Sequence, residues 1–366
     1  MVNRLIVANL VTRPVRTALS VTAVAVEMIL ILLVVGLTHG MLRESATRTV
    51  GVGAEIMVQP QSTSFLMGIS GTPMPVAIGE RIAEIPGVRA VSPVATQVSS
   101  EGGVTIIYGI DPERFDTVSG GFRFLEGGPM QAADEILVDD IHARARNLRA
   151  GQNVVLLNHT FRLAGIVEHG KGARIFMNID MLQELIGAPG RASLFFVKVD
   201  APEETAPVLG RLRELLPNYQ LRDMEEFITL MTADNIPGLN NFITVMIALA
   251  VSIGLLVIFI TMYSTIVERT REIGILKSMG ASKGYIVGVV LRETALLTVL
   301  GIVAGIGLAF LLRWLTQVVF PTLPILLTVE WMVRAGLIAF GASLLGSIYP
   351  AFRASKLDAI QAIAYE

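Results

Sequence analysis

The chain has 366 residues, of which 52% are apolar and 16% charged, and its mean hydropathy is +0.63. These values argue against a soluble enzyme and against a disordered scaffold, because disorder requires few apolar residues and many charges. The 29 Lys and Arg residues against 31 Asp and Glu residues leave no basic excess for nucleic acid, and the absence of cysteine excludes disulfides, thiolate nucleophiles and Cys-ligated zinc.

Four apolar stretches are long enough to cross a bilayer as helices, which takes about 20 residues each. They cover residues 17–40, 242–263, about 285 to 312, and 335–352. The first run continues well past the A-x-A pattern at residues 23–25, so we expect a retained helix and not a cleaved signal peptide. Apolar and basic residues at helical spacing precede it, which suits an amphipathic helix along the inner membrane face.

The distribution of Lys and Arg predicts the orientation of these spans. Three basic residues precede the first span, four lie between the second and third, and two follow the fourth. Since basic residues accumulate on the cytoplasmic side, we predict that both termini are cytoplasmic in a multi-pass protein of the cell (inner) membrane. Residues 41–235 carry 17 basic and 24 acidic side chains, and we expect this insert to lie outside the cytoplasm.

The insert between the first and second spans alternates short apolar runs with Gly, Pro and Asp, which is typical of a mixed α/β domain. Its two ends, residues 48–102 and 190–232, are predicted to form one lobe, with a smaller lobe inserted between them. The predicted strands are residues 56–58, 88–94, 104–110, 135–138, 153–157, 160–167 and 194–199, and the predicted helices are residues 76–85, 179–186 and 203–215.

The predicted fold class is therefore an α-helical membrane protein with four transmembrane helices, arranged one plus three, and a two-lobed α/β extracytoplasmic domain between the first and second helices. We divide the chain into residues 1–40, with the amphipathic segment and first span; residues 41–236, the outer domain; and residues 237–366, with the other three spans.

Residues 165–171, G-I-V-E-H-G-K, match the spacing of a phosphate-binding loop as far as its lysine. The next residue is Gly172, where a magnesium-binding Ser or Thr is required, and the segment follows a predicted strand but opens no helix. We interpret it as a strand that ends in a Gly-rich turn. The chain is thus predicted to have no ATPase site of its own.

The histidines and the paired carboxylates predict no catalytic or metal site. The histidines are scattered without a carboxylate at metal-ligand spacing, and we expect them to be solvated. Adjacent carboxylates such as Asp139 and Asp140 point in different directions, and no nucleophile elbow is present. We therefore expect no catalysis, no cofactor and no metal. The histidines are His39, His142, His159 and His169.

Three charged residues lie inside predicted spans, where charge is costly and marks function or pairing. Glu27, Arg292 and Glu293 lie at similar depths, about 10 to 15 Å from the cytoplasmic ends of their helices. Two interpretations stay open: Glu27 pairs with Arg292 inside the bundle, or Arg292 reaches toward the lipid headgroups. On the third span, Gly301 and Gly305 form a G-x-x-x-G pattern that lets another helix approach closely.

Residues 267–282, V-E-R-T-R-E-I-G-I-L-K-S-M-G-A-S, lie between the second and third spans. As a short helix they would expose several charges beside an apolar edge with Ile273 and Leu276, which suits docking on another protein. This stretch resembles the signature of the FtsX-like permease family, whose members include the MacB-type exporters and the LolC and LolE subunits.

The resemblance extends over nearly the whole chain. Residues 350–363 resemble the family's ending, with Ala359 and Ile363 in place of its usual Pro and Leu, and family members carry a Glu near Glu293. The outer segment resembles the MacB-like core domain in three pieces. They are I-P-G-V at residues 85–88, Y-G-I-D-P-E-R-F at residues 108–115 and F-R-L-A-G-I-V at residues 161–167.

This resemblance implies a permease that dimerises with a like or unlike chain, sits in the lipid bilayer, and receives a separate ABC ATP-binding subunit on the loop of residues 264–284. It also implies that the first two spans extend outward as a stalk, for which residues 41–50 and 222–240 have the polar character. A periplasmic adaptor and an outer-membrane channel are further expected partners only in a cell with two membranes. The expected coupling residues are Glu268, Arg269, Arg271, Glu272, Gly274, Leu276, Lys277 and Gly280.

Three function classes remain open on the sequence. The first is export or extraction of an amphipathic or hydrophobic substrate, which could be a macrolide, a peptide, a lipid, a lipoprotein or haem. The second is an FtsX-type signalling subunit that regulates a cell-wall hydrolase without transport. The third is a membrane sensor without any ATPase, which would leave the family-like loop unexplained. The large outer segment favours the exporter.

Overall fold

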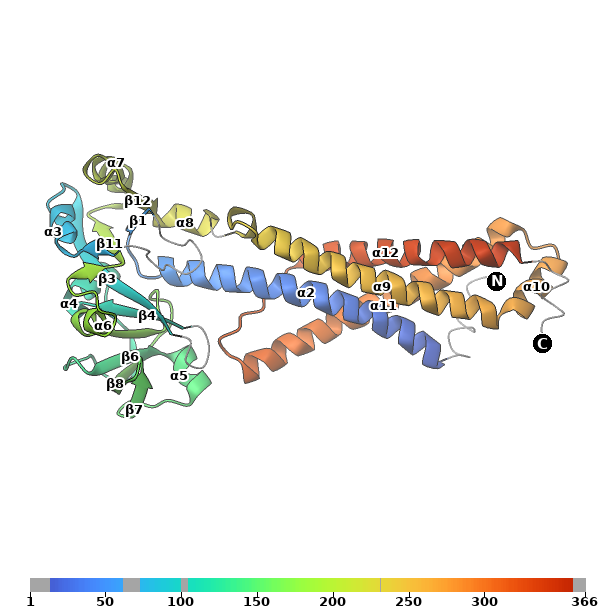
Figure 1. The fold of residues 1–366 in the computed structure, drawn as a ribbon, viewed down its shortest axis with the longest axis horizontal. Helices are drawn as coiled ribbons and strands as arrows, with labels where there is room; N and C mark the ends of the chain where they lie inside the picture. Colours follow the sequence, from blue (N-terminus) through green and yellow to red (C-terminus); the bar gives the residue numbers. More distant parts are fainter. Residues whose placement is uncertain (1–13, 62–72, 100–104, 231, 358–366) are drawn as a thin grey trace. The chain divides into compact units, whose positions relative to one another are not determined.

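The computed structural model describes residues 14–61, 73–99, 105–230 and 232–357 (Figure 1). The chain divides into two compact units. The helical unit comprises residues 1–39, 238–316 and 325–366, and the sheet unit comprises residues 40–237 and 317–324. The predicted amphipathic segment at the N-terminus lies outside the described residues, as do Ala359 and Ile363.

The helical unit contains helices that are long and apolar enough to cross a membrane, and they confirm the four predicted spans. Each helix runs beyond the apolar stretch that predicted it, because hydrogen bonding continues into the polar flanks. The helices are α2 (Pro14–Val50), α9 (Leu239–Glu268), α11 (Lys283–Val319) and α12 (Val329–Lys356), with the short helix α10 (Thr270–Ser278) between α9 and α11. Residues 40–50 of α2 belong to the sheet unit.

Apolar side chains exposed along α9 suit contact with lipid. They recur at helical spacing, as on a helix that faces hydrocarbon on one side. These residues are Phe242, Val245, Leu249, Ile253, Leu256 and Ile260.

Small residues bring the helices of this unit close together. A side chain at Gly346 of α12 would place its Cβ 2.9 Å from the carbonyl oxygen of Leu255 on α9. The carbonyl of Gly36 on α2 accepts a hydrogen bond from the backbone N–H of Leu326 at 2.8 Å. Because lipid provides no hydrophobic drive for helix association, close packing of this kind holds such a bundle together.

The two predicted stalk segments differ in structure. α2 is one uninterrupted helix as far as Val50. The segment of residues 222–240 is not a continuous helix, since it contains α8 (Met224–Leu230) and the 3₁₀ turn η2 (Ala233–Asn235) before α9 begins. Gly238 has a φ of +81°, and Pro237 lacks a backbone donor, so helical hydrogen bonding stops there.

Within the described residues, the sheet unit is built on a mixed sheet of ten strands, in the order β12-β1-β11-β3-β4-β9-β6-β8-β5, with β7 paired to β8. Neighbouring strands are antiparallel except for the pairs β4–β9 and β6–β8. The strands of this sheet are β1 (Ile56–Pro60), β3 (Val88–Ser99), β4 (Thr105–Ile110), β5 (Phe124–Gly127), β6 (Glu135–Asp139), β7 (Asn153–Leu156), β8 (His159–Val167), β9 (Ile175–Asn178), β11 (Leu194–Val199) and β12 (Tyr219–Asp223). β2 (Met74–Pro75) and β10 (Arg191–Ala192) form a separate two-stranded sheet. The helices of this unit between β2 and β12 are α3 (Ala77–Ala83), α4 (Pro112–Ser119), α5 (Asp140–Arg146), α6 (Ile179–Leu185), the 3₁₀ turn η1 (Pro202–Glu204) and α7 (Thr205–Leu215).

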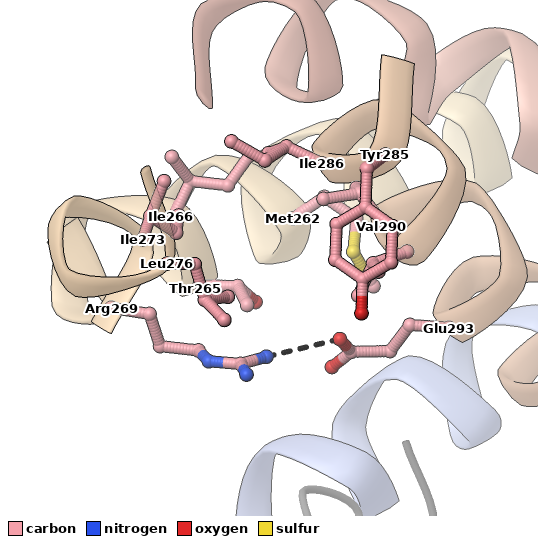
Figure 2. A pocket seen from close by; sticks show the side chains of 11 residues that line it. Met262, Thr265, Ile266, Arg269, Ile273, Leu276, Tyr285, Ile286, Val290 and Glu293 are labelled. Atoms are coloured by element: carbon pink, nitrogen blue, oxygen red, sulfur yellow. Dashed lines mark hydrogen bonds and ion pairs between the residues drawn. The ribbon is translucent and has the colours of Figure 1, made fainter. Parts of the chain in front are cut away.

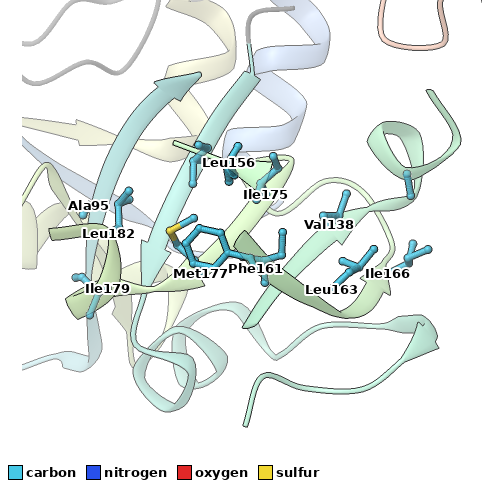
Figure 3. Close-up of a cluster of buried hydrophobic side chains, with 13 residues drawn as sticks. Ala95, Val138, Leu156, Phe161, Leu163, Ile166, Ile175, Met177, Ile179 and Leu182 are labelled. Atoms are coloured by element: carbon cyan, nitrogen blue, oxygen red, sulfur yellow. The ribbon is translucent and has the colours of Figure 1, made fainter. Parts of the chain in front are cut away.

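Two apolar cores divide this unit into the predicted lobes. The large lobe packs α3 and α7 on β1, β3 and β11 around side chains such as Ile82, Phe195 and Leu212. The small lobe packs α5 and α6 with β4, β6, β8 and β9 around Phe161 and Met177 (Figure 3). The lobes share one continuous sheet, because β3 of the large lobe pairs with β4 along residues 94–99.

Every predicted strand and helix of the insert is present, but several elements were not predicted. β5 is exposed along its whole length and gives no apolar pattern, whereas the buried apolar run of β9, residues 175–177, was missed although it is as long as the predicted run at residues 56–58. The start of α4 did carry a signal. Asp111 caps this helix by accepting from the backbone N–H groups of Glu113 and Arg114, and Pro112 occupies its first turn.

Candidate functional site

The candidate site is the short helix α10, which has a clear start and stop in the sequence. Arg269 leaves helical geometry with φ −103° and ψ +14°, and this separates α10 from α9. At the other end Gly280 adopts a φ of +93°, which favours glycine. The backbone N–H of Gly280 donates to Lys277 and that of Ala281 donates to Leu276, both at 3.0 Å. These bonds satisfy the last carbonyls of α10 and fix its length.

A cluster of buried ion pairs holds the start of α10 to the rest of the helical unit. Arg269 donates to Glu293 of α11 at 3.0 Å and to Glu272 at 2.8 Å. Arg16 of α2 also donates to Glu293, at 3.3 Å, and lies 3.7 Å from Glu268. The Glu293 side chain is only 3% exposed, so two guanidinium groups compensate a carboxylate that would otherwise be costly to bury. The cluster joins α2, α9, α10 and α11.

Lys277 holds the end of α10 to the end of α12. Its Nζ donates to the carbonyl oxygens of Ser355 at 2.8 Å and Leu357 at 2.5 Å. The last carbonyls of a helix have no partner within the helix and carry partial negative charge, so a lysine there stabilises the helix end. α10 is therefore fixed at both ends.

A small apolar pocket of about 40 Å³ lies behind α10, between α9 and α11. Figure 2 shows Arg269 and Glu293 pointing toward one another at one side of this pocket. Ile266, Ile273 and Ile286 supply apolar lining from the three helices. The volume admits about one or two water molecules. α10 is thus held by its ion pairs and by packed apolar side chains, which leave a small cavity between them.

The opposite face of α10 is exposed and both charged and apolar. Arg271 and Glu272 are exposed there, as are Ile275 at 45% and Met279 at 72%. These two apolar residues were not among the predicted coupling residues, because the sequence predicted an apolar edge at Ile273 and Leu276, which face inward in the structure. An exposed Met beside an exposed Ile is typical of a protein-docking surface.

The structure thus divides the eight predicted coupling residues. Four of them tie or pack α10 internally, and four are exposed. Arg269, Leu276 and Lys277 are half-buried and Gly274 is buried, whereas Glu268, Arg271, Glu272 and Gly280 are exposed.

The intramembrane charges do not form the Glu27–Arg292 pair, and the other interpretation, in which Arg292 reaches toward the lipid headgroups, stays a prediction. Glu27 of α2 is 2% exposed, and neither of its carboxylate oxygens has a hydrogen-bond partner among the described residues. It packs against Gly254 of α9, where any side chain would overlap the carboxylate. Arg292 is exposed and has no ion pair within the described part of the chain, while its neighbour Glu293 points inward. Adjacent residues of a helix face about 100° apart, so only one of this pair can enter the bundle.

Gly301 and Gly305 lie against α2. A Cβ at Gly301 would be 2.5 Å from the Cβ of Val24, and one at Gly305 would be 2.6 Å from the Cβ of Met28. Such distances allow no side chain, so the G-x-x-x-G pattern is the surface on which α11 and α2 meet.

The phosphate-loop-like segment does not have the geometry of a nucleotide site. It leads from β8 into β9 and opens no helix. The Nζ of Lys171 donates to the carbonyl oxygen of Ser119 at 2.5 Å, at the end of α4. Within the described residues, His, Asp and Glu form no group of three that could hold a metal ion.

The expectation of solvated histidines is wrong for His142. This residue is 8% exposed in α5. Burial, followed by the nearby charges of Arg146 and Arg174, lowers the pKa of His142 to about 4. His169 is exposed, and its Nδ1 lies 2.9 Å from Asp140. Burial raises the pKa of Asp140, but the hydrogen bonds with His169 and the charge of Arg144 outweigh it and lower this pKa.

Two family models match the chain and together cover most of it. The model described as FtsX-like permease C-terminal matches residues 244–359, and the model described as MacB-like periplasmic core domain matches residues 17–215. The first match includes α10 and the three later spans.

Individual relatives agree with these models. The chain is 34% identical over 175 residues to the ABC transporter permease YknZ of Bacillus subtilis, covering 45% of this chain and 41% of YknZ. It is 29% identical over 318 residues to the macrolide export ATP-binding/permease protein MacB 1 of Aeromonas hydrophila, covering 78% of this chain and 48% of that protein. The periplasmic region of MacB from Actinobacillus actinomycetemcomitans aligns with a TM-score of 0.38 and 15% identity, over 50% of this chain and 94% of that one.

Proposed function

Because the chain belongs to the ABC transporter permeases that combine an FtsX-like permease domain with a MacB-like periplasmic core domain, we propose that it couples ATP hydrolysis in a separate ATP-binding subunit to movement of its sheet unit. The sheet unit is inserted between the first and second membrane helices. The movement would expel or extract an amphipathic or hydrophobic substrate, a class supported by the macrolide export named for the MacB relative.

The observation that carries this proposal is the two-sided character of α10. Its exposed face, with Ile275 and Met279 beside Arg271, offers a docking surface. Its inward side is tied to α11 by Arg269 and to α12 by Lys277. A partner that pushes on the exposed face therefore displaces the helices themselves.

The ion cluster at Glu293 gives the displacement a route to α2. Glu293 binds Arg269 of the α9–α10 junction and Arg16 of α2 through its two oxygens. A change in the position of α10 is thus passed to the helix that leads into the sheet unit. Two copies, or one copy and a paralogue, would provide two such helices. The proposed orientation puts α10 on the cytoplasmic side, where ATP is available.

The test is co-purification of the full-length chain in mild detergent with its ATP-binding subunit, identified by mass spectrometry. The double variant Ile275→Asp, Met279→Asp places two charges on the exposed face and should lose the subunit. Val155→Asp makes the same kind of change at an exposed apolar residue of β7 and should retain it. Retention by the double variant overturns the docking surface. An ATP-binding subunit missing from the wild type overturns the permease function.

Transport is then separated from signalling by reconstituting the complex. ATP-dependent release of a substrate supports the exporter. ATP-dependent activation of a co-purifying cell-wall hydrolase, without release of any substrate, replaces the exporter with the signalling subunit.

A further inference from the structure

The outer end of α2 is fixed to the large lobe through the backbone. The helix ends at Val50 and leads directly toward β1, which lies in the large lobe. Lys198 of β11 donates through Nζ to the carbonyl of Gly53 at 2.6 Å and pairs with Glu55 at 2.7 Å. The other oxygen of Glu55 accepts from the backbone N–H of Val199 at 2.9 Å. This junction leaves the turn between helix and strand little freedom.

A second attachment joins the same helix to the small lobe. Arg174, directly before β9, pairs through one nitrogen with Glu44 of α2 at 2.6 Å and through another with Asp139 at the end of β6 at 2.9 Å. The side chain of Arg174 is 7% exposed and that of Asp139 is 1% exposed. Asp139 is itself held, since it accepts from the backbone N–H of His142 at 2.7 Å. The guanidinium thus bridges α2 and two neighbouring strands of the small lobe.

Gly51 and Gly172 let the end of α2 approach this lobe. A side chain at Gly51, directly after α2, would overlap the carbonyl oxygen of Gly170. Gly172, in the loop before β9, has a φ of +91°, and a Cβ there would lie 2.5 Å from the ring of Tyr108 and 3.1 Å from Val52. Glycine is needed at these positions for close approach to a backbone carbonyl and for a left-handed conformation.

We propose that residues 170–174, with Glu44 and Asp139, form a joint that makes the small lobe follow α2. Glu44 and Arg174 are its positioning residues. Apart from the joint, the small lobe is connected to the helix through the large lobe and the shared sheet at the pairing of β3 with β4. With it, α2 holds both lobes, and the sheet unit turns as one body when the helix moves. A role for that motion in transport rests on the proposed function, whereas the contacts that form the joint all lie within the sheet unit.

The variant that isolates the joint is Glu44→Ala. It removes the contact between α2 and Arg174, keeps the Arg174–Asp139 pair that the small lobe needs, and introduces a residue that favours helix. Arg43→Ala is the matched control, because Arg43 is the preceding residue on the same helix and is exposed. A cooperative thermal unfolding transition of each variant in detergent establishes that both are folded.

The measurement is double electron–electron resonance between two spin labels on the full-length chain. The chain contains no cysteine, so two introduced cysteines are the only labelled positions. Met41 and Val155 are both exposed and report α2 against the small lobe, while Met41 and Glu214 report α2 against the large lobe. We expect Glu44→Ala to broaden the Met41–Val155 distance distribution about twofold and to leave the Met41–Glu214 distribution unchanged.

The outcomes separate the joint from the transport function. An unchanged Met41–Val155 distribution in Glu44→Ala overturns the joint, and so does equal broadening in Arg43→Ala. Arg174→Gln, which removes the centre of the bridge, gives a second test and should broaden the same distribution further. These results need no nucleotide and no partner. If the joint is present but ATP produces no motion or release in the wild-type complex, the proposed function fails and the joint stands.

Discussion

The two ends of α2 are held by ion clusters of opposite design. In the helical unit, the carboxylate of Glu293 lies between the guanidinium groups of Arg16 and Arg269. In the sheet unit, the guanidinium of Arg174 lies between the carboxylates of Glu44 and Asp139. In each cluster the central group is almost completely buried and the outer groups belong to different elements. α2 is thereby tied to other helices at one end and to strands β6 and β9 at the other.

The clusters differ in how much water reaches their outer members. At the inner end, the side chains of Arg16 and Arg269 are 15% and 12% exposed, whereas at the outer end Glu44 is 29% and Asp139 is 1% exposed. A buried charge that loses its partner cannot be rescued by water, so removal of the central group should cost most at the inner end, where both outer groups are largely buried. Between the two ends α2 packs on α11 through glycine contacts. Ion pairs hold the two ends of the helix, and close packing predominates between them.

Removing the centre of the inner cluster should have the largest effect. Glu293→Gln leaves two arginines buried without a carboxylate between them, and we expect the helical unit to lose about 3–5 kcal/mol of stability. The thermal unfolding of the purified chain in detergent measures this loss. Arg292→Gln is the control, since the adjacent residue is exposed. Equal melting temperatures for the two variants would show that the cluster contributes nothing to stability.

The contact between the middle of α2 and α11 tests how much close packing contributes to stability. Gly305→Leu forces a side chain against Met28 and the backbone of Ala25, and we expect a loss of about 1–3 kcal/mol. Gly307→Leu lies on the same helix two residues away, where a Cβ meets nothing within 4 Å, and should be close to neutral. The same unfolding experiment compares them. A neutral Gly305→Leu would mean that α2 and α11 do not pack as the structure has them.

The sequence predicted those parts of the structure that depend on local patterns. The four spans follow from runs of apolar residues, and the strands of the sheet unit follow from short apolar segments bounded by turns. The helix contact at Gly301 and Gly305 could be predicted because a G-x-x-x-G pattern places both glycines on the same face of one helix. Of the strands that were missed, β5 is exposed and gives no apolar pattern, whereas β9 does carry a short apolar run.

The partners of buried charges could not be predicted in the same way. The sequence places Glu27 and Arg292 at similar depths in their helices. However, a shift of one residue decides which side chain of α11 faces the bundle, and that side chain is Glu293, not Arg292. Arg174 meets Glu44 across 130 residues of sequence, and no local pattern encodes such a contact. The inward and exposed faces of α10 were likewise set by tertiary packing, which placed Ile273 inside and Met279 outside.

Lower pH should weaken the sheet unit. The folded state keeps His142 neutral with a pKa of about 4, whereas the unfolded chain takes up a proton near pH 6.5. Stability from this residue is therefore present above pH 6.5 and is lost as the pH falls toward 4, by about 1 kcal/mol at pH 5.5. Hydrogen exchange of β6 and α5 between pH 7.5 and 5.5, corrected for intrinsic rates, measures the loss. In His142→Leu this pH dependence should disappear, and its persistence would assign the effect to another group.

An ion pair on the surface of the sheet unit should show the smallest effect. Arg123 pairs with Glu168 at 3.3 Å, but the two side chains are 76% and 47% exposed. Water screens such a pair and its side chains lose entropy when they are held, so Arg123→Gln should cost only about 0.2–1 kcal/mol. Raising the salt concentration should remove most of that difference, whereas Arg174→Gln should remain destabilising in high salt because its carboxylate partner Asp139 is buried. Unfolding of both variants at low and high salt makes the comparison. Equal salt dependence would mean that burial does not distinguish the ion pairs that hold α2 from those on the surface.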